Sequence, residues 1–180
     1  MTARKFPGVV LVGFMGSGKS SVGREIASIT GAEFVDTDAW IEEKHGRAIM
    51  EIFLKEGETA FRKMEKSALG EILSVKGRVV AAGGGAFLDE ENRNKMKAYA
   101  PVVYLEVKAE TVMQRLGNDA KRPLIQSGDR DAVVRSLLEK RIPEYRLADY
   151  AVAADELKET EIAERIIELL EKGREAAHDP

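Results

Sequence analysis

Runs of aliphatic residues alternate along the chain with stretches in which apolar residues recur at helical spacing. The uninterrupted runs have the length and the β-branched content of strands that are buried on both faces. We expect five strands, at residues 9–12, 33–35, 78–82, 101–106 and 150–153. Strands that alternate with helices predict a doubly wound α/β fold, with a parallel sheet flanked by helices.

The segments between these strands carry the spacing of amphipathic helices. Between the second and third strands we expect helical stretches at 39–44, 49–55 and 58–75, which form a helical insertion over about residues 39–76. Further helices are expected from residue 19, at 89–97, 109–116 and 129–141, and around 162–170. The long insertion should break at Gly57, Pro143 should kink or interrupt a later helix, and residues 173–180 should fray.

One octapeptide, Gly-Phe-Met-Gly-Ser-Gly-Lys-Ser at residues 13–20, fits the pattern G-x-x-x-x-G-K-[ST] at each fixed position. A buried strand precedes it and a helix opens inside it, which is the context expected of a phosphate-binding loop, or P-loop. Its glycines let backbone N–H groups approach phosphate oxygens, and the helix N-terminus favours their negative charge. Lys19 can reach the β- and γ-phosphates, and the Ser20 hydroxyl can hold Mg²⁺. The segment therefore predicts a nucleoside triphosphate site.

The composition limits the remaining possibilities. Charged residues make up 33% of the 180 residues and the net charge is −3, which argues against a general nucleic-acid or membrane-surface binder. The chain has no cysteine, so disulfides, thiolate metal sites and a cysteine nucleophile are excluded. No apolar run approaches the ~20 residues of a membrane span, and no signal-peptide pattern opens the chain. We expect one domain, over residues 1–180, in the cytoplasm.

Two carboxylates, Asp36 and Asp38, follow the second predicted strand at the sheet edge where α/β proteins bind ligands. If the extended backbone continues, side chains two apart face the same side, and both enter the cleft. One could then orient a Mg²⁺-bound water while the other accepts a proton from a substrate hydroxyl. The alternative is structural, with Asp38 as the cap of the next helix and Asp36 as a turn residue.

Three glycines, Gly83-Gly84-Gly85, directly follow the third predicted strand. They suit either a tight turn or a place where a ligand approaches backbone N–H groups closely. Arg62 has Glu65 three residues later on a predicted helix. That spacing is typical of a surface ion pair, although arginine is also the side chain that binds carboxylates through two parallel hydrogen bonds.

A polar segment at residues 117–128 predicts a mobile loop, and the cations of interest beside or within it are Arg115, Lys121 and Arg122. Such cations can fold over bound phosphates, or they can simply belong to a basic surface loop. Arg141, two residues before Pro143, leaves the same two possibilities open.

Taken in order, these motifs resemble those of the shikimate kinase family, which belongs to the P-loop kinases related to nucleoside monophosphate kinases. The resemblance covers nearly the whole chain up to the last strand. It rests on residues 13–20, Asp36-Thr37-Asp38, Gly57-Glu58 with Phe61-Arg62 and Glu65, Gly83-Gly84-Gly85, Arg122-Pro123-Leu124, and Arg141 with Pro143 and Tyr145. The P-loop ends in Lys-Ser-Ser where Lys-Ser-Thr is commoner, a departure that keeps the metal-binding hydroxyl at Ser20.

The resemblance implies Mg²⁺-dependent transfer of the ATP γ-phosphate to the 3-hydroxyl of shikimate, on the pathway to chorismate and aromatic amino acids. It implies ATP binding by Gly13, Gly16, Ser17, Gly18, Lys19, Ser20, Ser21, Arg115 and Arg122, and metal binding by Ser20 and Asp36. It implies shikimate binding by Asp38, Arg62, Gly83, Gly84, Gly85 and Arg141, in a pocket lined or braced by Trp40, Phe53, Phe61 and Glu65. Lys19, Asp38 and Arg122 would be catalytic, with Asp38 as the base and Arg122 on a lid at about residues 117–128. We expect a monomer that binds this small molecule, and neither nucleic acid nor membrane.

Two alternatives remain at this point. A kinase of another small polyol acid, such as gluconate, would share a similar P-loop and aspartate pair, but not the set of Arg62, Gly83-Gly84-Gly85 and Arg141. A catalytically idle nucleotide-sensing module would lack the P-loop lysine, the metal-binding hydroxyl or the acid, and all three are present.

Overall fold

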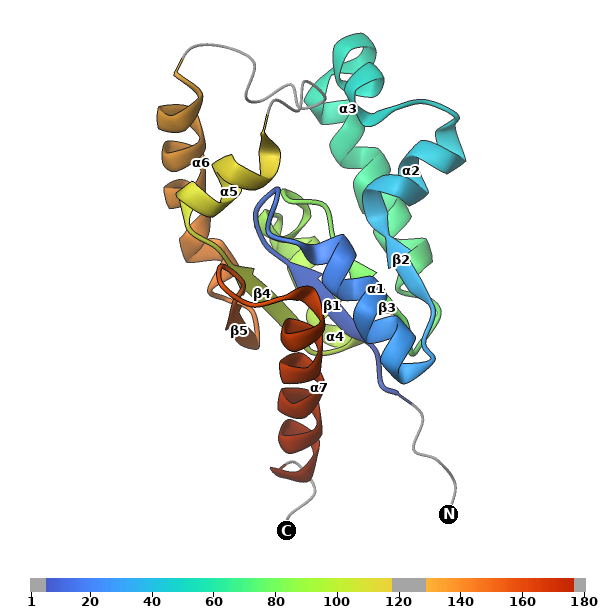
Figure 1. Cartoon of the computed structure of the whole chain (residues 1–180). Coiled ribbons are helices and arrows are strands. Elements are labelled where there is room, and N and C mark those ends of the chain that lie inside the picture. Colours follow the sequence, from blue (N-terminus) through green and yellow to red (C-terminus); the bar gives the residue numbers. More distant parts are fainter. Residues whose placement is uncertain (1–5, 118–128, 177–180) are drawn as a thin grey trace.

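The computed structural model describes residues 6–117 and 129–176, and within them it contains one parallel sheet flanked by helices (Figure 1). The five strands lie in the order β2-β3-β1-β4-β5, and all neighbours are parallel. Their bounds are Val9–Val12 for β1, Phe34–Asp36 for β2, Val79–Ala81 for β3, Val102–Glu106 for β4 and Tyr150–Ala153 for β5. The predicted fold class is therefore confirmed, and each strand lies within one residue of its predicted bounds.

Helices connect these strands in chain order. Their bounds are Lys19–Thr30 for α1, Thr37–His45 for α2, Ile49–Ile72 for α3, Ala86–Leu88 for the short 3₁₀ helix η1, Glu90–Tyr99 for α4, Ala109–Leu116 for α5, Arg130–Tyr145 for α6 and Glu159–Ala176 for α7. α1 and α7 pack against each other on one face of the sheet, and α4 lies behind the sheet in this view (Figure 1). Both α2 and α3 lie between β2 and β3, so this connection is longer than a single crossover helix.

The predicted break in the long insertion is confirmed at Gly57. Its φ of 81° and ψ of 172° interrupt the helical backbone of α3. Essentially only glycine adopts this conformation, since a Cβ would clash with the backbone. The break separates the first two turns of α3 from the part that carries Arg62 and Glu65.

Two predictions about helix ends are wrong. α6 is not interrupted at Pro143 but continues through it to Tyr145. Pro143 stands in the last turn, so its missing N–H costs one intrahelical hydrogen bond, to the exposed residue Glu139. α7 also continues past Gly173 to Ala176 instead of fraying there, where the Tyr150 side chain lies so close that a Cβ at Gly173 would overlap its hydroxyl oxygen. The rest of the segment expected to fray, residues 177–180, lies outside the described residues.

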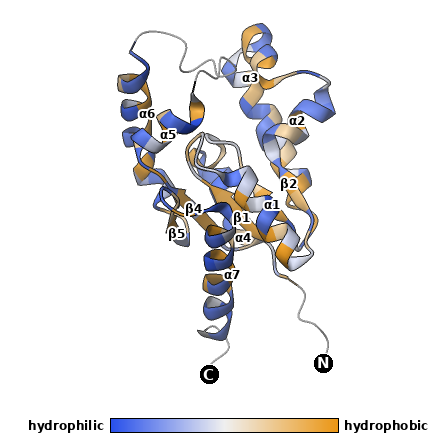
Figure 2. Cartoon of the chain, viewed as in Figure 1, coloured by the Kyte–Doolittle hydropathy of each residue, from blue (hydrophilic) through white to orange (hydrophobic). Residues whose placement is uncertain are grey.

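Apolar residues of the strands and of the inward helix faces form the core. β1 lies at the centre of the sheet, and its residues Val9, Val10 and Leu11 have no exposed surface. Figure 2 shows this division, with hydrophobic colour on the strands and hydrophilic colour along the outer side of α7. None of the helices in the described ranges is both long enough and apolar enough to cross a membrane.

The strand register brings three loops to one edge of the sheet. Ala81 of β3 pairs with Leu11 of β1 and also with Asp36 of β2. The P-loop, the aspartate pair and the glycine loop at residues 83–85 therefore leave the sheet at the same level. The carboxyl edge of a parallel sheet is where α/β proteins place their ligands.

Candidate active site

The P-loop, residues 13–20, joins β1 to α1 through glycines that need their conformational freedom. The φ of Gly13 is 145°, and a Cβ there would lie 2.8 Å from the carbonyl oxygen of Leu105. The Lys19 ammonium donates hydrogen bonds to the carbonyl oxygens of Gly13 at 2.9 Å and Phe14 at 2.8 Å. The lysine charge is thus held against the loop, next to backbone N–H groups at a helix N-terminus that favour an anion.

Asp36 connects the P-loop with α2. Its Oδ2 accepts a hydrogen bond from the Ser20 hydroxyl at 2.5 Å, and its Oδ1 accepts from the backbone N–H groups of Asp38 at 3.0 Å and Ala39 at 3.2 Å. The expected extended backbone and the alternative with Asp38 as the cap are both wrong, because the chain enters α2 directly after β2 and Asp36 is the N-cap. Asp38 instead lies in the first turn of α2.

A cavity of about 220 Å³ lies between these groups. Its walls come from the P-loop, the ends of β2 and β3, and the glycine loop: Met15, Gly16, Gly18, Lys19, Ser20, Ser21, Asp36, Asp38, Ala82, Gly83 and Gly84. The two aspartates therefore share one cavity with the P-loop lysine and serine, as the sequence predicts. The group of carboxylate, hydroxyl and ammonium around one space suits a triphosphate with a divalent cation.

The glycine loop is more than a tight turn, because charged side chains occupy the space that its own side chains would fill. A Cβ at Gly83 would lie 2.6 Å from Asp38 Oδ1 and 2.9 Å from Glu65 Oε1. A Cβ at Gly85 would lie 2.5 Å from Arg62 Nη1. Gly83 and Gly85 thus allow two carboxylates and a guanidinium to approach the backbone of the loop.

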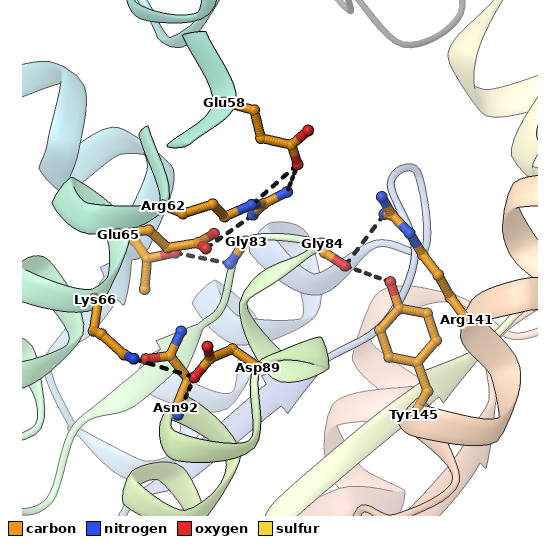
Figure 3. A network of polar contacts seen from close by, with 11 residues as sticks. Glu58, Arg62, Glu65, Lys66, Gly83, Gly84, Asp89, Asn92, Arg141 and Tyr145 are labelled. Carbon is orange, nitrogen blue, oxygen red and sulfur yellow. Dashed lines mark hydrogen bonds and ion pairs between the residues drawn. The ribbon is translucent and has the colours of Figure 1, made fainter. Parts of the chain in front are cut away.

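Two arginines reach the glycine loop from opposite sides (Figure 3). Arg62 comes from α3 and donates to Glu65 at 2.8 Å and to Glu58 at 3.0 Å. Arg141 comes from α6, donates to the Gly84 carbonyl oxygen at 3.4 Å, and is only 9% exposed. Two guanidinium groups on either side of backbone amides form an arrangement that can bind a carboxylate.

Glu65 shows that its pairing with Arg62 is not a solvated surface pair. Its side chain is 1% exposed, and its Oε1 has no hydrogen-bond partner within the described ranges. Burial raises the pKa of Glu65, the charge of Arg62 opposes this increase, and the charge of Asp38 adds to it. Glu65 therefore lies inside the site, beside the loop and the predicted base.

Arg115 lies on the other side of the P-loop. It extends from α5 and donates to the carbonyl oxygens of Ala154 at 2.6 Å and Gly16 at 3.3 Å. A second cavity, of about 290 Å³, is lined by Arg115, by the P-loop and by Leu157 and other residues near the start of α7. Arg122 and residues 118–128 of the predicted lid lie outside the described residues.

The aromatic residues expected in the substrate pocket do not line the 220 Å³ cavity. Trp40 is half-buried and packs against the hydrophobic core. Phe53 and Phe61 contact each other with ring centroids 4.7 Å apart. These three residues support α2 and α3, which carry Asp38 and Arg62, so among the described residues they brace the site more than they line it.

Two hydroxyl groups at the site have no role in the sequence analysis. The Thr37 hydroxyl accepts a hydrogen bond from the N–H of Gly83 at 2.8 Å, and Thr37 is fully buried. The Tyr145 hydroxyl donates to the Gly84 carbonyl oxygen. Both residues belong to the quoted motifs, but their partners come from distant segments, so only the folded chain shows these contacts.

Comparison with known proteins gives one consistent family. The model of the family described as shikimate kinase matches residues 15–171. The shikimate kinase of Vibrio parahaemolyticus serotype O3:K6 is 42% identical over 165 residues, which cover 91% of this chain and 96% of the relative. The shikimate kinase of Halorhodospira halophila is 44% identical over 164 residues, which cover 91% of this chain and 93% of the relative.

Solved structures agree. The shikimate kinase of Acinetobacter baumannii in complex with shikimate superposes with a TM-score of 0.90 and 40% identity, covering 93% of this chain and 94% of that one. The shikimate kinase of Aquifex aeolicus superposes with a TM-score of 0.82 and 31% sequence identity, covering 93% of this chain and 98% of that one. A gluconokinase of Sinorhizobium meliloti gives 0.62 at 22% identity, which is a likeness of fold alone.

Proposed function

The chain belongs to the shikimate kinase family, and we propose that it transfers the γ-phosphate of ATP to the 3-hydroxyl of shikimate with Mg²⁺ bound to the nucleotide. One observation supports this most strongly. The P-loop lysine, the Ser20–Asp36 pair and Asp38 border one cavity, and two arginines flank the glycine loop that forms its wall. The site therefore combines phosphate-binding groups with carboxylate-binding groups.

The Ser20–Asp36 pair fits Mg²⁺. It offers one hydroxyl and one carboxylate, which are hard oxygen donors, and the metal usually completes its shell with water and nucleotide phosphates. Within the described ranges no group of three or more His, Cys, Asp or Glu side chains could hold a metal ion alone. When bound, the ion would neutralise charge on the β- and γ-phosphates. Ser20 and Asp36 would hold it.

Lys19 and Asp38 act on the two ends of the transfer. Lys19, already held against the P-loop by two carbonyl oxygens, neutralises charge on the phosphates. Asp38 accepts the proton of the attacking hydroxyl, because it faces the same cavity from the first turn of α2. Little covalent chemistry is required of the protein, so the rate comes mainly from positioning and from charge stabilisation.

Arg62 and Arg141 bind the carboxylate of shikimate, together with the backbone N–H groups of Gly84 and Gly85, because the N–H of Gly83 already donates to Thr37. Their planar guanidinium groups suit a carboxylate better than the point charge of lysine. We assign the helical insertion at about residues 39–76 to the acceptor, since it carries Asp38 and Arg62. On the nucleotide side, Arg115 contacts the adenine, and Arg122, on a lid at about residues 117–128, adds positive charge at the phosphates.

A coupled assay of ADP release with shikimate, quinate and gluconate as acceptors tests the proposal. We expect shikimate to be the preferred acceptor, and phosphorus NMR of the product to locate the phosphate on the 3-oxygen. The Lys19→Ala variant is the control for background ATP hydrolysis by contaminants. Faster turnover of gluconate than of shikimate would refute the proposed substrate and favour the polyol-acid alternative.

A further inference from the structure

Two buried tyrosines stack against each other behind the glycine loop, but only one hydroxyl has a partner. Tyr104 of β4 and Tyr145 of α6 have ring centroids 5.2 Å apart and no exposed surface. The Tyr145 hydroxyl donates to the carbonyl oxygen of Gly84, whereas the Tyr104 hydroxyl has no hydrogen-bond partner in the part of the chain that is described. Burial raises the pKa of Tyr145, so its hydroxyl stays protonated and remains a donor.

The carbonyl that Tyr145 holds belongs to the same peptide unit as the N–H of Gly85. In a trans peptide these two groups point in opposite directions. Tyr145 and Arg141 hold the Gly84 oxygen on the α6 side, and Arg62 lies on the opposite side of the loop (Figure 3). The trans geometry of the peptide therefore directs the N–H of Gly85 towards the Arg62 side. Arg62 is close enough there that a Cβ at Gly85 would clash with its guanidinium.

The amides of this loop are available to a ligand. Within the described residues the N–H of Gly83 donates to Thr37, while those of Gly84 and Gly85 donate to no protein group. Two adjacent N–H donors beside an arginine form a concave site for an anion. Their direction depends on what fixes the peptide units, because three successive glycines have wide conformational freedom.

We propose that Tyr145 is a positioning residue for the acceptor carboxylate, an inference that rests on the proposed function. Its hydroxyl fixes the Gly84–Gly85 peptide so that the N–H of Gly85 meets the carboxylate. It also lets Arg141 act on the substrate. The contact of Arg141 with the Gly84 oxygen is 3.4 Å long, and Tyr145 remains as a donor to that oxygen when Arg141 turns to the carboxylate.

The Tyr145→Phe variant tests this, with Tyr104→Phe as the matched control. Both changes remove one buried phenolic oxygen and keep the stacked rings. In Tyr145→Phe we expect the KM for shikimate to rise roughly tenfold, as for one lost hydrogen bond to a half-buried carbonyl. The KM for ATP and kcat should stay within about twofold of wild type, because the lost contact acts only on the acceptor side of the site. Tyr104→Phe should change none of the three.

The methyl ester of shikimate separates positioning from a general structural defect. The ester lacks the negative charge, so wild type should use it far less efficiently than shikimate. In Tyr145→Phe this preference, measured as the ratio of the two kcat/KM values, should shrink roughly tenfold. A general loosening of the site would lower both values equally and would overturn the proposal.

Other outcomes are equally decisive. An unchanged KM for shikimate in Tyr145→Phe, or an equal effect of Tyr104→Phe, would overturn the proposal while leaving shikimate kinase activity in wild type intact. Loss of the folded state in Tyr145→Phe, seen by circular dichroism, would also overturn it, because the hydroxyl would then serve the fold. Absence of shikimate phosphorylation in wild type would remove the proposed function itself, and this inference with it.

Discussion

Replacing Arg62 by lysine separates carboxylate recognition from simple charge. Arg62 is 32% exposed and donates to the buried carboxylate of Glu65 and to Glu58. Lysine keeps a positive charge beside Glu65, so the fold should tolerate it, but it loses the planar pair of donors. The expected loss of shikimate affinity is about 1.5–3 kcal/mol, the value of one hydrogen bond to a charged group, or roughly 10- to 150-fold in Kd.

The magnitude also distinguishes lysine from alanine at this position. Arg62→Ala would leave the Glu65 carboxylate buried and without its counter-charge. Removing one partner of a fully buried ion pair costs about 3–5 kcal/mol, and the cost here should be smaller because Arg62 is partly exposed and Glu65 can take up a proton. Arg62→Ala would therefore confuse binding with stability. The lysine variant is the cleaner test.

Calorimetric titration gives the Kd values directly, and Arg135→Lys provides the matched control. Arg135 also pairs with two carboxylates, Asp131 and Glu110, but it is exposed on α6 and does not line the cavity. We expect Arg135→Lys to bind shikimate like wild type, and both variants to bind ATP like wild type. An equal loss of ATP and shikimate affinity in Arg62→Lys would refute its assignment to the carboxylate.

Three further outcomes are expected. Lys19→Ala should abolish phosphoryl transfer, because the phosphates lose their fixed counter-charge, and near-normal turnover in the coupled assay would contradict the P-loop assignment. Arg122→Ala should lower kcat far more than it weakens ATP binding, since we expect its contact with the phosphates to strengthen towards the transition state. Unchanged steady-state kinetics in this variant would refute a catalytic role for Arg122. Glu65→Gln should change how stability depends on pH. The pKa of Glu65 is raised in the folded state, so its contribution is present below the unfolded pKa and is lost as pH rises through the folded value. In urea denaturation, wild type should therefore lose stability relative to Glu65→Gln as pH rises from 4.5, and parallel curves would contradict this.

The fold could be predicted because its signals are local. A strand buried on both faces is a continuous aliphatic run, and β1 has that run with no polar interruption. Glycines that adopt positive φ end α1 at Gly31 and α2 at Gly46, and interrupt α3 at Gly57. The errors at Pro143 and Gly173 arose where tertiary packing and position within the last turn outweighed local propensity.

The candidate site divides in the same way. The P-loop is one contiguous motif, so its lysine and serine could be assigned from the sequence without any partner. Arg62 could not be assigned from the sequence, because an ion pair at helical spacing is usually an exposed surface pair. What decides the matter is the burial of Glu65 against Gly83, which belongs to another loop. Contacts of this kind depend on strand order, and strand order cannot be predicted from any short segment of the sequence.

The position of Asp36 explains why the acceptor and metal parts of the proposed site lie on rigid elements. β2 leads into α2 without an intervening loop, and Asp36 stands at the junction. One of its oxygens holds the Ser20 hydroxyl, and the other holds the backbone N–H of Asp38. The proposed base is therefore tied through one carboxylate to the proposed metal ligand. A flexible connection would let Asp38 move independently of the phosphate, and phosphoryl transfer depends mainly on the relative position of these groups.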